Sequence, residues 1–162
     1  MQSTQQLQAW LLNQAKAHGI ARASTKVINP NRVRLIMSTP DVKSYLEISR
    51  YMPNPMHVVY SLDANMEDQD NAKLGVGHFA RFDVYKNLAS KNHDSRQSFL
   101  EDIKEVRKAL IGFGDEQYKA VRNQETPDEK ALERTKRIRA SAISLADLTT
   151  AIARAVTFST ET

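Results

Sequence analysis

The strongest secondary-structure signal in the sequence is the stretch TPDEKALERTKRIRASAISLADLTTAIARAVT, residues 126–157. Thr126 and Glu129 have the spacing of a capping box, and Pro127 suits the first helical position, where its missing N–H needs no partner. Apolar residues then recur at Leu132, Ile138, Ala142, Leu145, Leu148, Ile152 and Val156. At ~1.5 Å per residue such a helix is ~45 Å long, more than the ~30 Å width of a small domain. We expect it to bend or to pack against neighbouring subunits.

Two further helices are predicted upstream of this one. An apolar stripe at Phe99, Ile103, Val106, Leu110 and Phe113 has helical spacing, and Gly112 and Gly114 are predicted to close that helix. Residues 4–18 also have an apolar face, with Ser3 or Thr4 available as a cap and Gly19 as the end.

The region between these helices alternates between extended and turn patterns. Residues 32–37 are predicted to form a strand with Arg32 and Arg34 on one solvent-facing side, and residues 19–31 a loop. Residues 56–62 and 76–85 are predicted to form strands that pair across a polar segment, 63–75. Thr39, Pro40 and Asp41 are interpreted as the start of a helix over 42–51, with Val42, Tyr45 and Leu46 inward.

These elements predict one domain, residues 1–162, of the mostly α (α+β) class. We expect a helical bundle with one long C-terminal helix and a small antiparallel sheet. A hydrophobic content of 41% with 26% charged residues argues against disorder and against a membrane span. Since residues 1–5 lack a basic and apolar leader, we expect a virion or cytoplasmic protein that is not secreted by a signal peptide.

Positive charge is unevenly distributed along the chain. Within residues 1–40 the basic residues are Lys16, Arg22, Lys26, Arg32 and Arg34, and there is no acidic residue. A second basic run, residues 134–139, opens an acid-free stretch that extends to residue 146. Two such clusters are typical of contact with a polyanion, although a solvated surface explains them equally well.

Signatures of catalysis and metal binding fail on spacing. The absence of cysteine excludes thiolate chemistry and cysteine-containing metal sites. The acidic segment 63–70 resembles a calcium loop, but Asp68 stands where that loop needs glycine and Leu74 where it needs glutamate. His57 and His78 lie on neighbouring predicted strands, as in paired-histidine phosphodiesterases, but each lacks a hydroxyl residue two positions later. We therefore predict no catalytic residue, no metal and no cofactor.

Three segments resemble tobamovirus-type rod-shaped virus coat proteins: ALIGFGD (109–115), RNQ (122–124) and LERTKRI (132–138). In that family a helix leads through a Phe-Asp turn and a Glu-Asn-Gln loop to a long helix. The resemblance implies a helical bundle that stacks into rods around RNA.

The resemblance also implies roles for individual residues. Arg137 corresponds to an arginine that faces RNA phosphates, and Lys136 corresponds to its neighbour. The family's Arg-x-Arg pair after the turn is Gln117-Tyr118-Lys119 here, so one of its two cations is missing.

The leading hypothesis is a non-enzymatic structural protein: a viral or phage coat-like subunit that forms homo-oligomers and contacts nucleic acid, in particular RNA, through phosphates. The predicted nucleic-acid-binding residues are Arg134, Lys136, Arg137, Arg139, Lys119, Arg32 and Arg34. One alternative is an adaptor or regulatory module that binds protein through apolar helix faces. A less favoured one is a small phosphodiesterase using His57 and His78.

Overall fold

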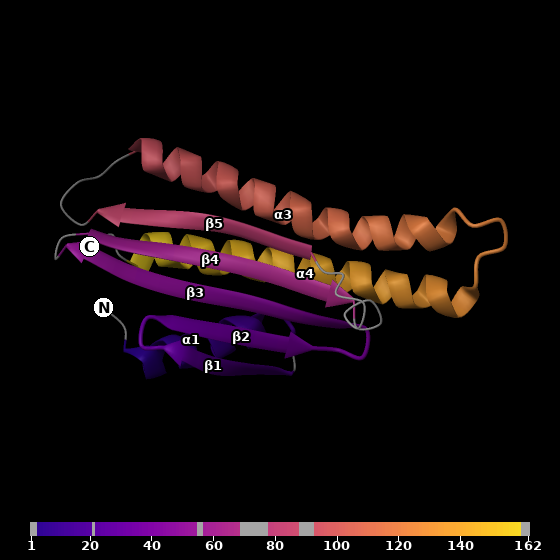
Figure 1. The fold of residues 1–162 in the computed structure, drawn as a ribbon, viewed down its shortest axis with the longest axis horizontal. Helices are drawn as coiled ribbons and strands as arrows, with labels where there is room; N and C mark the ends of the chain where they lie inside the picture. The colour runs from indigo at the N-terminus through magenta and orange to yellow at the C-terminus, as the bar shows by residue number, and fades with distance from the viewer. Residues whose placement is uncertain (1–2, 21, 55–56, 69–77, 88–92, 160–162) are drawn as a thin grey trace.

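The computed structural model describes residues 3–20, 22–54, 57–68, 78–87 and 93–159. In Figure 1 the strands lie side by side in one layer, α1 and α4 lie behind it, and α3 runs along the β5 side. The elements in chain order are α1 (Thr4–Ala17), β1 (Ala23–Asn29), β2 (Arg32–Ser38), β3 (Val42–Asn54), β4 (His57–Asp68), β5 (His78–Asn87), α3 (His93–Arg122) and α4 (Glu129–Ser159). The α+β class and the long C-terminal helix are confirmed.

Helix α1 forms as its sequence predicts. The Ser3 hydroxyl accepts the N–H of Gln6, and the Gln6 side chain accepts the N–H of Ser3, so the capping box is complete. Leu7 and Leu11 are buried on one face. Gly19 ends the helix with φ +73°, a conformation that glycine adopts without steric cost.

The sheet is an antiparallel meander in the order β1-β2-β3-β4-β5. Alternate residues of its strands are buried under the helices, since successive side chains of a strand point to opposite faces. Leu35 pairs with Leu46, and Leu46 with Ala64, so these three lie in one row of the core. The buried alternating set is Val33, Leu35, Met37, Val42, Leu46, Ile48, Leu62, Ala64 and Met66.

Helices α3 and α4 pack against each other along an antiparallel hairpin whose connected end projects past the sheet in Figure 1. Helix α3 of the same chain therefore packs along α4. The length of α4 alone had led us to expect a bend or a neighbouring subunit. Ile138, Leu145 and Ile152 are buried, as the helical spacing predicts. Among the helices of the described ranges, none combines the length and the apolarity that a membrane span needs.

The prediction that Gly112 and Gly114 close a helix is wrong, because α3 continues through both to Arg122. The structure gives Gly114 a different role. A Cβ atom placed on Gly114 would lie 2.9 Å from Arg139 Cα, so glycine permits a close approach of the two helix backbones.

The predicted helix over 42–51 is also wrong, since this segment lies in β3. The Thr39 hydroxyl accepts the N–H groups of Asp41 and Val42, at 3.3 and 3.1 Å, and closes a tight turn between β2 and β3. The same side-chain chemistry caps helices and forms turns, so the Thr-Pro-Asp pattern suits both. Val42 and Leu46 share a face in a helix and in a strand alike.

Two segments predicted as loops contain strands. Residues 23–29 form β1, and residues 63–68 are the end of β4. Residues 69–77 of the acidic segment lie outside the described residues. Within the described residues the sheet therefore has five strands, more than the small sheet predicted, and the helices cover one of its faces instead of forming a bundle alone.

Candidate functional site

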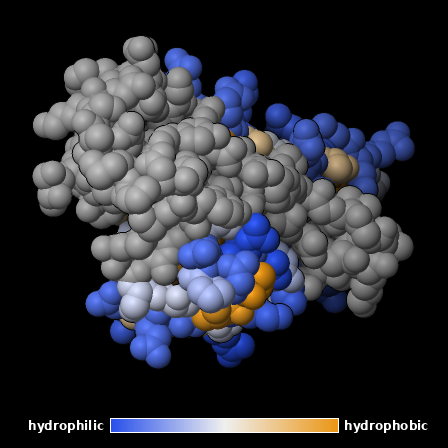
Figure 2. All heavy atoms as spheres, turned by 60° about the vertical axis from the view of Figure 1, so that its left-hand side comes forward, coloured by the Kyte–Doolittle hydropathy of each residue, from blue (hydrophilic) through white to orange (hydrophobic). Residues whose placement is uncertain are grey.

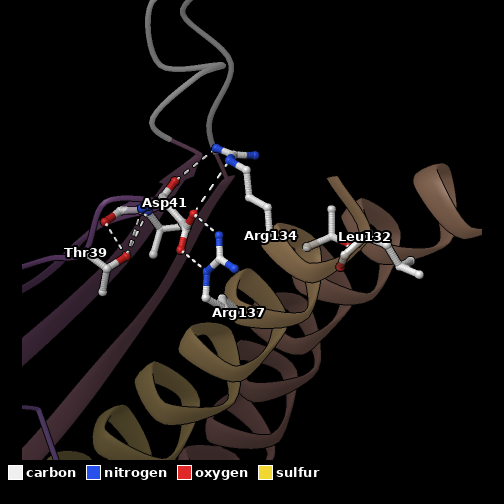
Figure 3. A network of polar contacts seen from close by, with 7 residues as sticks. Thr39, Asp41, Leu132, Arg134 and Arg137 are labelled. Carbon is white, nitrogen blue, oxygen red and sulfur yellow. Dashed lines mark hydrogen bonds and ion pairs between the residues drawn. The ribbon is translucent and has the colours of Figure 1, made fainter. Parts of the chain in front are cut away.

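Two of the predicted phosphate-binding arginines converge on Asp41, in the turn before β3 (Figure 3). Arg137 Nε and Nη2 donate hydrogen bonds to Asp41 Oδ2 and Oδ1, at 2.8 and 3.1 Å. Arg134 Nη2 donates to the Asp41 carbonyl oxygen at 3.3 Å, and its Nε lies 3.7 Å from Oδ1. Asp41 is only 7% exposed. Both arginines therefore hold α4 against the β2–β3 turn. They are not both available to bind a phosphate.

The hydrogen bond to Asp41 also acts on the charge of Arg137. It raises the pKa of the Arg137 guanidinium above its ordinary value, and the field of Glu133 adds to it, while desolvation and Arg134 oppose it. Arg137 thus carries its positive charge at every pH at which the protein would be studied. Its side chain is 59% exposed, so its outer surface still faces solvent.

The remaining cations of the basic helix run have partners of their own. Lys136 Nζ lies 3.0 Å from Glu133 Oε1. The Arg139 guanidinium lies 4.2 Å from the centroid of the Tyr118 ring. A cation at this distance over an aromatic face is attracted by the ring quadrupole.

The same Tyr118 ring lies 5.4 Å from the guanidinium of Arg122, the last residue of α3. Lys119, the neighbour of Tyr118, is exposed. We call Tyr118, Arg122 and Arg139 the hairpin cluster. Of the predicted residues it includes Arg139 of α4 but not Lys119.

Arg32 and Arg34 lie on the face of the sheet opposite the helices, as predicted. Val33 and Leu35, which alternate with them, are fully buried on the helix side. Arg32 Nε donates to Ser49 Oγ at 3.0 Å, and Arg34 Nη2 lies 3.5 Å from Glu47 Oε1. The latter pair is loose, and the Arg34 side chain is 36% exposed.

The strand register adds two lysines and a tyrosine to this outer face. Lys26 of β1 pairs with Arg34 of β2. Arg34 and Lys43 each place their charge 5.5 Å from the centroid of the Tyr45 ring. We call Lys26, Arg32, Arg34, Lys43 and Tyr45 the sheet cation surface. Glu47 pairs in register with Asp63, and Lys43 with Glu67, so acidic positions follow on β4 and the cationic part is confined to β1, β2 and the start of β3.

Sequence reasoning missed several residues of these clusters. Lys26 and Lys43 were not among the predicted binding residues, because their segments were predicted to form a loop and a helix. The Asn-Pro-Asn turn signal at 29–31 pointed to Lys26, because a hairpin centred there brings Lys26 opposite Arg34. No sequence signal links Asp41 to Arg137, 96 residues away.

The paired-histidine arrangement does not form within one chain. His57 pairs with Asn87 at one end of the β4–β5 ladder, whereas His78 pairs with Met66 at the other end. The nine residue steps from His57 to Met66 correspond to about 30 Å at ~3.3 Å per residue. The backbone positions of the two histidines are therefore too far apart for one phosphodiester to lie beside both.

Within the described ranges no group of three or more metal-ligating side chains is placed to hold an ion. Comparisons with protein-family models, with curated proteins and with solved structures find no match for this chain.

Proposed function

We propose that this chain is a non-enzymatic, self-associating protein that binds nucleic acid, in particular RNA, through its phosphates. The observation that carries the proposal is the sheet cation surface. Arg34 and Lys43 flank one tyrosine on the outer face of the sheet, and Lys26 lies in register with Arg34. This surface replaces the basic helix run as the main contact, because Asp41 and Glu133 already pair with three cations of that run.

The chemistry of this surface suits phosphates better than bases. Lysine ammonium groups and an arginine held only loosely by Glu47 can neutralise successive phosphates of a strand. Tyr45 is partly exposed and adds a ring on which an unpaired base can stack. Binding of this kind depends on counterion release, so it is steeply salt-dependent and tolerant of sequence.

Self-association is supported by the edge strand β1. Its one strand neighbour in the sheet is β2, so the other edge of its backbone lacks a strand partner within the described chain. Val27 and Ile28 on this strand are 42% and 37% exposed. Figure 2 shows one apolar patch among mostly hydrophilic described atoms, in the lower part of the view, the side on which Figure 1 draws α1, β1 and β2. Unpaired edges with apolar residues favour pairing with another strand.

A coat-like role, in a virion or in the cytoplasm, fits these properties, because a coat subunit must bind both its own copies and nucleic acid. The resemblance to tobamovirus-type coat proteins supports this role less than the surface does. Phe113 and Asp115, which that resemblance would place in a turn, lie inside α3.

The direct test is fluorescence anisotropy of a labelled single-stranded RNA with the purified chain over a salt series, together with electron microscopy of the mixture. We expect affinity to fall by more than tenfold between 50 and 200 mM salt, roughly as three or more phosphate contacts require, and regular particles to form. Absence of both binding at low salt and particles would overturn the proposal.

One alternative retains a specific observation. The edge of β1 can equally accept a strand from a different protein, as an adaptor module would. Copurification of one stoichiometric protein partner, without absorbance from nucleic acid, would favour that function.

A further inference from the structure

A cavity of about 560 Å³ lies where α4 passes the β2–β3 turn and the segment after α1. Its walls include Ile20 from that segment, Met37 and Val42 from the sheet, and Leu145 from α4. The volume is within the range of about 300–1,000 Å³ that small-molecule sites occupy. The cavity is separate from the sheet cation surface, because Met37 and Val42 face the helix side of the sheet.

Ser44 supplies an unsatisfied hydroxyl to this cavity. It lines the cavity and is only 5% exposed, yet its side chain makes no hydrogen bond within the described part of the chain. The other described buried polar side chains all have partners: Ser49 accepts from Arg32, Thr135 and Thr149 donate to backbone carbonyls, and Asp41 accepts from Arg137. Buried polar groups are almost always hydrogen-bonded, so the Ser44 hydroxyl indicates a partner that the described residues do not supply.

Two serines of α4 add further hydroxyl groups to the wall of the cavity. Ser141 and Ser144 are three residues apart, so they lie on one side of the helix, and both line the cavity. The nearby Thr149 and Thr150 hydroxyls donate to the carbonyl oxygens of Leu145 and Ala146. Ser141 and Ser144 make no such bond to a described residue, so their hydroxyls are available to a ligand.

One charged side chain stands out in the wall of this cavity. Among the described lining residues Arg22 is the one that carries a charge, and it is exposed, at the solvent side. Within the described residues Arg22 forms no ion pair. A guanidinium beside an otherwise neutral, largely apolar cavity favours a ligand with one anionic group.

We propose that this cavity binds a small organic carboxylate with an apolar body and a second oxygen group. The carboxylate pairs with Arg22 at the solvent side, and the apolar body packs against Met37, Val42 and Leu145. The second oxygen group is a hydroxyl or a carbonyl, and it hydrogen-bonds with Ser44. A simple fatty acid satisfies the first two contacts but leaves the Ser44 hydroxyl without a partner.

Isothermal titration calorimetry of the full chain with three probes tests each part of this proposal. The probes are 10-hydroxydecanoate, decanoate, which lacks the hydroxyl, and decane-1,10-diol, which lacks the charge. We expect 10-hydroxydecanoate to bind about three- to tenfold more tightly than decanoate, as one added hydrogen bond provides, and the diol to bind more weakly than either.

Two variants locate the contacts. Ser44→Ala should weaken 10-hydroxydecanoate about three- to tenfold, leave decanoate within about twofold, and leave the melting temperature unchanged or raised, because it removes an unsatisfied group. Arg22→Gln should weaken both acids about tenfold and leave the diol unchanged. Arg154→Gln, an exposed arginine on α4 that does not line the cavity, is the matched control and should change nothing.

Three results would overturn the proposal. No heat from any probe would show that the cavity does not take this class of ligand. An equal effect of Ser44→Ala on both acids, or no effect on either, would show that the ligand's second oxygen group does not bind Ser44 and that a buried water pairs with it instead. Full binding of both acids by Arg22→Gln would show that Arg22 does not bind the carboxylate.

Discussion

Arg137 of α4 holds Asp41 of the β2–β3 turn through two parallel hydrogen bonds, at 2.8 and 3.1 Å, across 96 residues of sequence. Paired bonds of this kind fix orientation as well as distance. They dock the long helix on the turn that leads into β3, where the Thr39 hydroxyl organises the backbone (Figure 3). Arg137, which the sequence predicts to contact a polyanion, thus holds two parts of the fold together.

Asp41→Asn should destabilise the fold, because it leaves two arginines without their carboxylate while the turn remains buried. We expect the melting temperature to fall by about 2–5 °C, a modest value since Arg137 is largely exposed to solvent. Glu116→Gln, an exposed acid on α3, is the control and should leave the melting temperature unchanged. Equal melting temperatures for the two variants would show that the tie is dispensable.

The same pair predicts a flat pH dependence for its arginine. The hydrogen bond to Asp41 raises the pKa of Arg137 above its ordinary value, so its contribution is complete below that ordinary value and is lost only as pH rises through the higher, folded value. The destabilisation caused by Arg137→Gln should therefore be constant between about pH 6 and pH 10. Urea unfolding of both proteins over this range measures it, and a cost that vanishes by pH 10 would contradict the assignment.

Gly114 and Gly112 should respond to alanine with opposite signs, although both lie in α3. Gly114→Ala should cost about 1–3 kcal/mol, since the new Cβ would meet Arg139 Cα at 2.9 Å and force the helices apart. A Cβ on Gly112 would meet no atom within 4 Å, so Gly112→Ala should stabilise by about 0.5–1 kcal/mol. Chemical denaturation measures both, and a loss of stability in both variants would mean that α3 and α4 do not cross as described.

The edge strand gives a prediction for assembly. Val27→Lys should shift the chain toward monomer, because a charge on an exposed edge strand opposes pairing with another strand. Ile143→Lys changes a residue of similar exposure on α4, 40% against 42%, and should leave association unchanged. Sedimentation velocity distinguishes them, and monomer formation by Ile143→Lys alone would move the interface to the helix.

The sequence pattern predicted the three helices well because each has a long apolar stripe. It predicted the wrong element where the spacing of apolar residues fits both a helix and a strand. Val42 and Leu46 fit a helix and a strand equally, and Thr39 can serve as a cap or close a turn. The cations Arg32 and Arg34 were placed correctly, since alternation with Val33 and Leu35 needs no knowledge of other elements. The pairing of Arg137 with Asp41 and of Lys43 with Tyr45 depends on how separate elements pack, so local spacing could not predict it.

Two triple variants of equal charge, compared in the RNA salt series, show whether RNA binds the sheet cation surface. One removes the sheet cations, Lys26→Gln with Arg34→Gln and Lys43→Gln. The other removes exposed helix cations, Lys104→Gln with Lys108→Gln and Lys130→Gln.

For the sheet variant we predict that the slope of log affinity against log salt shrinks by about 2, since each lost contact to a single strand removes ~0.7. The helix variant should keep the slope and affinity of the unmodified chain. Equal losses in both variants would contradict the claim, because they would show that RNA responds to net charge and not to the surface around Tyr45.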